Sequence, residues 1–68
     1  MNIESLEAIA YEIVKQLPKS TFKKLVAVPE EKQEEVIGQI YEIAEDFIKK
    51  EFIKYTIAMI KERDNRDR

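Results

Sequence analysis

The 68-residue chain contains no cysteine and no histidine. Zinc, haem and iron–sulfur sites favour thiolate and imidazole ligands, so we expect none of these cofactors and no other metal site. Nucleophilic triads of the Ser-His-Asp or Cys-His kind cannot be assembled either. Disulfides cannot stabilise the fold, and a chain of this length buries only about 60% of the surface that its unfolded form exposes. We therefore expect a partner subunit to add stability.

Glycine, proline and long apolar runs are also scarce. One glycine, Gly38, cannot form a Gly-rich phosphate loop, and we expect it on the solvent side of a helix. No apolar run approaches the ~20 residues that span a bilayer, so no membrane partner is expected. Glu4 and Glu7 stand where a secretory signal carries Lys or Arg, which favours a cytoplasmic protein. These absences predict a non-enzymatic protein without a small-molecule substrate.

What the chain does contain is charge and helical periodicity. Charged residues make up 38% of the sequence, and there are ten isoleucines against three leucines, a composition typical of thermophiles. Apolar residues recur at helical spacing, which predicts an all-α fold in a single domain, residues 1–68. The first helix is expected over residues 3–17, capped by Asn2 and ended by Pro18, and a short connecting helix over residues 20–27.

A long C-terminal helix is predicted over residues 30–63, followed by a polar tail at residues 64–68. Pro29 suits the start of this helix, and no later proline interrupts it. The alternative is a break near Lys49–Glu51. The first half of the predicted long helix carries an apolar stripe that would cover the first helix in a helical hairpin. The stripe consists of Val36, Ile37, Ile40, Tyr41, Ile43, Ala44, Phe47 and Ile48.

In the second half of this helix, apolar residues move to another face. A first helix of about 15 residues is too short to cover them, which predicts a partner interface there. Two hairpins would then form an antiparallel four-helix bundle as a homodimer; the alternative partner is a different protein. The predicted interface residues are Phe52, Ile53, Tyr55, Ile57, Met59 and Ile60.

Charge is segregated along the chain in a way that favours the antiparallel arrangement. Seven carboxylates and one lysine lie between Glu30 and Asp46, whereas residues 47–68 carry seven basic and four acidic residues. Two antiparallel copies would therefore bring acidic and basic halves together. The expected neighbours are Glu34, Glu35 and Glu42 of one chain and Lys50, Lys54 and Lys61 of the other.

A basic patch supports an alternative function. Lys15, Lys19, Lys23 and Lys24 lie in a segment without acidic residues, and lysines can contact nucleic-acid phosphates. Residues 28–36 resemble the start of helices in small antitoxin-like proteins, which implies a small regulator. The acidic residues that follow Pro29 would repel phosphate, so nucleic-acid binding is not the favoured interpretation.

The acidic cluster of Glu42, Glu45 and Asp46 has the spacing seen in all-helical nucleotide pyrophosphatases, but we interpret it as a solvated helix face.

Overall fold

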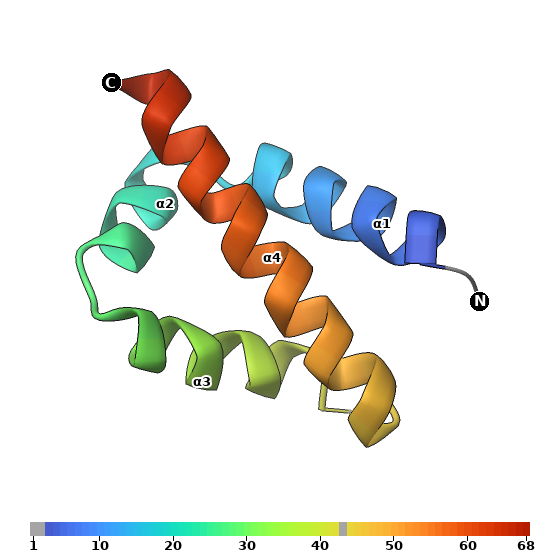
Figure 1. Cartoon of the computed structure of the whole chain (residues 1–68). Helices are drawn as coiled ribbons and strands as arrows, with labels where there is room; N and C mark the ends of the chain where they lie inside the picture. Colours follow the sequence, from blue (N-terminus) through green and yellow to red (C-terminus); the bar gives the residue numbers. More distant parts are fainter. Residues whose placement is uncertain (1–2, 43) are drawn as a thin grey trace.

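The computed structural model describes residues 3–42 and 44–68, and within them every regular element is an α-helix (Figure 1). The prediction of an all-α fold is confirmed. The order is α1 (Ile3–Gln16), α2 (Lys19–Val26), α3 (Glu30–Ile40) and α4 (Asp46–Asp67). The predicted cap Asn2 and the place of Ile43 on the apolar stripe lie outside the described residues.

The two prolines of the sequence lie at helix boundaries. α1 ends two residues before Pro18, because a residue that precedes proline is disfavoured in helical geometry. Pro18 and Pro29 occupy the N-cap positions of α2 and α3, with φ, ψ of −57°, 147° and −59°, 154°. Both helices begin within one residue of the predicted positions.

The predicted continuous helix over residues 30–63 is wrong. The chain leaves helical geometry at Tyr41 and resumes it at Asp46, so the break lies upstream of Lys49–Glu51, the alternative location. Glu45 is the N-cap of α4, and its φ, ψ of −61° and 151° match those of the two prolines at the earlier N-caps. The break divides the predicted long helix into α3 and α4, so the described residues form four helices where the prediction had three.

Tertiary contacts explain the break where local propensity does not. The Tyr41 ring stacks on Phe52 with 4.4 Å between ring centroids, and its hydroxyl lies 3.3 Å from the Thr56 hydroxyl. These contacts require α4 to fold back past the end of α3. A straight rod would leave this apolar surface in water, and its burial offsets the helical hydrogen bonds lost at the turn.

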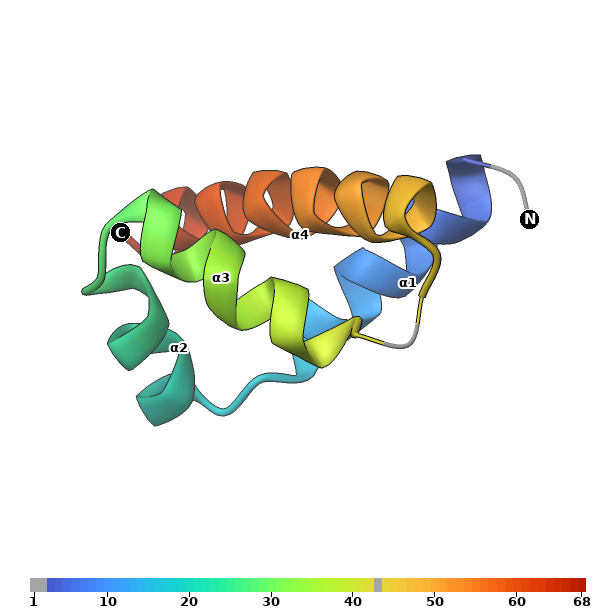
Figure 2. The same cartoon turned by 90° about the horizontal axis from the view of Figure 1, so that it is seen from below.

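The helices are arranged in two layers. In Figure 1, α1, α2 and α3 form three sides of an open frame, and α4 crosses the frame diagonally. Figure 2 shows α4 running along one side of the molecule, with α2 and most of α1 and α3 on the other. α4 packs mainly against α1 and also against α3. The core cluster lies between the layers and consists of Leu6, Val14, Phe22, Ile37, Tyr41, Phe52, Ile57 and Ile60.

Two further predictions need correction. The segment predicted as a polar tail after the helix, residues 64–68, is helical up to Asp67 and forms the last turn of α4, which Arg63 fixes through contacts with α1 and α2. Gly38 is not on the solvent side, since it is buried where α3 approaches α4. A Cβ atom at this position would lie 3.5 Å from the Lys49 side chain and 3.6 Å from that of Ile53.

Candidate protein-interaction site

The residues predicted to bind a partner do not form one exposed face. Phe52, Ile57 and Ile60 are only 8%, 6% and 2% exposed, and all three belong to the core of this chain. Ile53, Tyr55 and Met59 are half-buried and pack against that core. The assignment of the first three residues to a partner interface is thus corrected: the fold-back at Tyr41 lets α1 and α3 cover them.

The lysines predicted to pair with a second copy lie beside acidic residues of their own chain. The acidic residues of α3 and the lysines of α4 face each other across a shallow depression that Ile53 lines, and Lys61 forms a 2.9 Å ion pair with Glu30. Both side chains of this pair are more than half exposed, so the pair contributes little to stability. Charged side chains of both signs from α3 and α4 therefore border this depression, and one ion pair crosses it.

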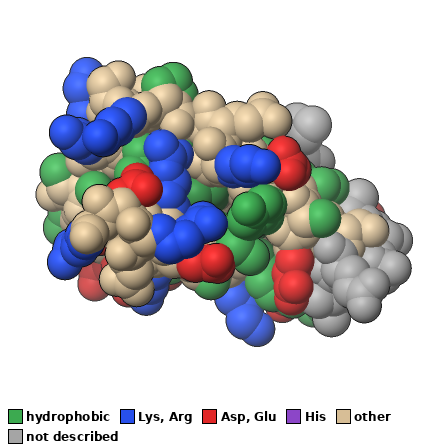
Figure 3. Space-filling model, turned by 90° about the horizontal axis from the view of Figure 1, so that it is seen from above, with side chains coloured by type: hydrophobic (Ala, Val, Ile, Leu, Met, Phe, Trp, Pro, Cys, Tyr) green, Lys and Arg blue, Asp and Glu red, His purple; other side chains and the backbone are tan. Residues whose placement is uncertain are grey.

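The four lysines of the basic patch are exposed, and three of them lie on α2. Asp64 and Asp67 of α4 line the same hollow as Lys19 and Lys23, so carboxylates interrupt the patch. In Figure 3, Lys and Arg side chains gather towards the end of the molecule that carries α2 and the C terminus, with acidic side chains between them. The folded surface is less uniformly basic than the sequence segment.

A wholly apolar groove lies on the side of the frame opposite α4. Its volume is about 120 Å³, and its walls come from α1, α2 and α3, with Thr56 of α4 reaching it from below. The lining residues are Ile13, Val14, Leu17, Thr21, Leu25, Val36, Ile37, Ile40, Tyr41 and Thr56. An empty apolar cavity of about 150 Å³ accepts a benzene-sized group, so this groove has room for an apolar side chain.

The rim of this groove carries exposed aliphatic residues. Ile40 is 62% exposed and Val36 is 37% exposed, and both lie on α3. Val36 and Ile40 belong to the stripe that the sequence assigned to covering the first helix. In the structure, α4 and not α3 provides most of the cover for α1, because the chain breaks after α3. Sequence periodicity does not predict this break.

Polar side chains from distant helices hold the groove walls in place. The Arg63 Nη1 group donates to the carbonyls of Val14 at 2.7 Å and Leu17 at 3.0 Å, at the open end of α1. Its guanidinium also lies 4.2 Å from the centre of the Phe22 ring in α2. One cation therefore satisfies helix-terminal carbonyls and ties three helices together.

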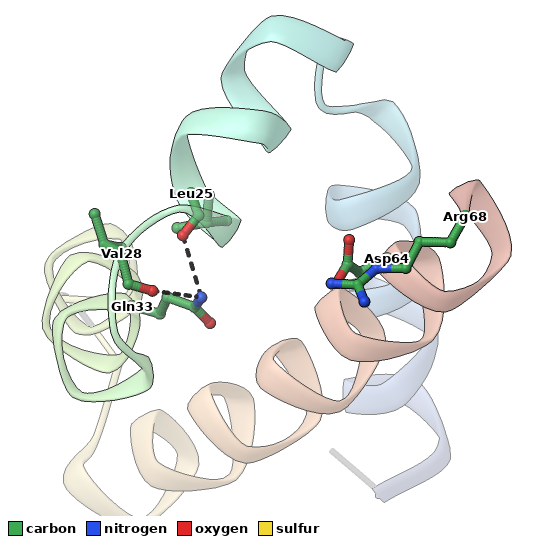
Figure 4. A network of polar contacts seen from close by, with 5 residues as sticks. All are labelled: Leu25, Val28, Gln33, Asp64 and Arg68. Atoms are coloured by element: carbon green, nitrogen blue, oxygen red, sulfur yellow. Dashed lines mark hydrogen bonds and ion pairs between the residues drawn. The ribbon is translucent and has the colours of Figure 1, made fainter.

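The Gln33 side chain likewise satisfies carbonyl groups at the end of α2. The buried Gln33 amide donates to the carbonyls of Leu25 at 3.1 Å and Val28 at 3.2 Å, at the end of that helix (Figure 4). The same figure shows the Asp64–Arg68 ion pair near the end of α4. Because Gln33 lies on α3, it fixes the corner between two walls of the groove.

The groove is chemically inert as well as apolar. The only polar side-chain groups among its lining residues are the hydroxyls of Thr21, Tyr41 and Thr56, and the last two bond to each other. Outside the groove, burial raises the pKa of Tyr55, and the hydrogen bond and charge of Glu51 and the charge of Glu7 raise this pKa further. The arrangement can bury apolar surface, but its lining holds no carboxylate or amine for acid–base chemistry.

Comparisons with protein-family models, curated proteins and solved structures found no match. Within the described residues, no group of three or more potential metal ligands lies together, and no helix is long and apolar enough to cross a bilayer. Function is therefore inferred from the surface of this chain alone.

Proposed function

We propose that this protein is a non-enzymatic helical module that acts through protein–protein interaction, with the apolar groove between α1, α2 and α3 as its binding site. The observation that carries the proposal is the wholly apolar lining of the groove, with Ile40 and Val36 exposed at its rim. Contiguous exposed apolar surface with a polar surround is typical of interaction sites.

The shape of the site supports a helical or side-chain ligand. Grooves between helices accept the apolar face of an amphipathic helix, with anchor side chains that enter pockets along the groove. The groove volume of about 120 Å³ suits one such anchor. Since Arg63 and Gln33 fix the ends of α1 and α2, the walls are preformed and little ordering entropy is lost on binding.

Affinity capture with matched variants tests this proposal. Ile40→Ser removes a large apolar groove residue that is 62% exposed, and Phe47→Ser removes one that is 74% exposed but does not line the groove. Both variants should fold like the original chain by circular dichroism, because neither position is buried. A protein ligand, another copy included, should bind the original chain and Phe47→Ser but not Ile40→Ser. Equal binding to all three would overturn the proposal.

Nucleic-acid binding through Lys15, Lys19, Lys23 and Lys24 is the second candidate, supported by the exposure of all four lysines. It predicts DNA or RNA binding that weakens steeply with salt and is lost when Lys19, Lys23 and Lys24 are changed to alanine together. A mobility-shift assay at low salt that shows no binding by the original chain would remove this candidate. The adjacent Asp64 and Asp67 make it the less favoured function.

A further inference from the structure

We propose that the occupant of the apolar groove is a second copy of this chain, docked face to face and antiparallel. In this arrangement, α2 of each copy meets the α3–α4 connection of the other. The inference rests on the proposed function, because it names the partner for the same groove. It replaces the interface predicted from the sequence, whose central residues Phe52, Ile57 and Ile60 are buried.

Two charged segments of opposite sign flank the groove; on the basic side, Asp64 and Asp67 share the hollow of Lys19 and Lys23, whereas Lys24 lies outside it. α2 has three exposed lysines, Lys19, Lys23 and Lys24, and no acidic residue. The α3–α4 connection and the first residue of α4 carry three exposed carboxylates, those of Glu42, Glu45 and Asp46, and the next lysine is Lys49. None of these six residues forms an ion pair with any residue that the structure describes.

These charged segments lie at opposite ends of the groove. α2 precedes α3 and the acidic connection follows it, so the 11 residues of α3 separate them by roughly 16 Å (Figure 2). A two-fold axis that runs across the groove superimposes each basic end on the acidic end of the other copy. The parallel alternative would place lysines on lysines. Charge therefore selects the antiparallel docking, because like-charge juxtaposition is strongly disfavoured.

The apolar rim supplies the affinity that exposed charges cannot. Each exposed ion pair is weak, whereas Val36 and Ile40 line the groove and present exposed apolar surface. A two-fold interface uses the same patch on both copies, so the patch has to be self-complementary. Val36 and Ile40 lie between the charged ends, which places apolar surface opposite apolar surface in the antiparallel pair.

Sedimentation equilibrium from micromolar to millimolar concentration tests the apolar part. The original chain should approach twice the monomer mass as concentration rises. Ile40→Ser should weaken this association at least about tenfold, and Phe47→Ser should leave it unchanged. Phe47 is the more exposed of the two, so association driven by general stickiness would show the reverse order and overturn the proposal.

Charge exchange tests the orientation. Lys24→Glu and Glu45→Lys should each weaken the dimer by about tenfold, since each two-fold dimer contains the altered contact twice. The double variant should regain most of the lost affinity, because the pair is then reversed and not removed. Lys50→Glu, which has the same charge change but lies in the α3–α4 depression, is the matched control and should have no effect. Absence of rescue in the double variant would overturn the antiparallel docking.

Failure of this inference is distinguishable from failure of the proposed function. A chain that remains monomeric at millimolar concentration, yet captures a different protein in an Ile40-dependent way, overturns the second copy and leaves the groove as the site. A monomeric chain that captures nothing through the groove overturns both.

Discussion

At the residue scale, two side chains complete helices to which they do not belong. The last carbonyls of a helix lack partners within it and need donors from elsewhere. Arg63 of α4 supplies these donors for α1, and Gln33 of α3 supplies them for α2. Both side chains therefore couple the end of one helix to the position of another.

Replacing Arg63 tests this coupling. Arg63→Ala should lower the free energy of unfolding by about 2 to 3 kcal/mol, because two charge-assisted hydrogen bonds and the contact with Phe22 are lost. The exposed Arg66 is the matched control, and Arg66→Ala should cost less than about 0.5 kcal/mol. Urea denaturation of both variants measures the difference. Equal effects would show that Arg63 does not cap α1.

The acidity of Tyr55 gives a second test at this scale. Burial and the neighbouring Glu51 raise the pKa of Tyr55, so the folded state holds the phenolic proton more tightly than the unfolded state. Its stabilising effect is present below the unfolded pKa of about 10 and is lost as pH rises through the folded pKa. Glu51→Gln should lower the pKa of Tyr55 in an NMR titration, whereas Glu62→Gln should not. An unchanged value would exclude Glu51 as a cause.

At the element scale, the break between α3 and α4 determines the fold. Pro18 and Pro29 predict the starts of α2 and α3, but the break between α3 and α4, Tyr41–Glu45, contains neither proline nor glycine. The sequence therefore predicted the first two helices and the start of the third. It could not predict the break, because the contacts of Tyr41 with Phe52 and Thr56 appear only after α4 folds back. The groove was missed for the same reason.

Proline at position 45 distinguishes the broken helix from a continuous one. Glu45 shares its backbone conformation with Pro18 and Pro29, so Glu45→Pro should fit and stabilise by up to about 1 kcal/mol through the unfolded state. Lys50→Pro lies inside α4 and should cost about 3 kcal/mol or more. Thermal and urea unfolding compare the two. Similar large losses would indicate that α3 and α4 form one helix.

The close approach of α3 and α4 at Gly38 allows a further test. An added Cβ would make ordinary contacts at 3.5 Å and 3.6 Å, and alanine favours a helix by about 1 kcal/mol over glycine. Gly38→Ala should therefore raise stability by about 0.5 to 1 kcal/mol in urea unfolding. Gly38→Leu should lower it, because a larger side chain must displace α4. A gain from leucine would argue against close packing here.

At the scale of the whole molecule, one small core holds four helices together. Ile57 lies in that core, so Ile57→Asp should unfold the chain and not merely separate subunits. Ile40→Asp places the same charge at an exposed site and should leave the helical content unchanged. Circular dichroism at low concentration checks both. A folded Ile57→Asp monomer would contradict the core assignment and restore the interface predicted from the sequence.

The contact between Arg63 and the end of α1 also bears on synthesis of the chain on the ribosome. The guanidinium binds carbonyls 49 and 46 residues earlier, and α1 packs mainly against α4, the helix farthest from it along this sequence. Nascent α1 and α2 therefore emerge without their final partners. We expect them to stay unfolded until translation has passed residue 63.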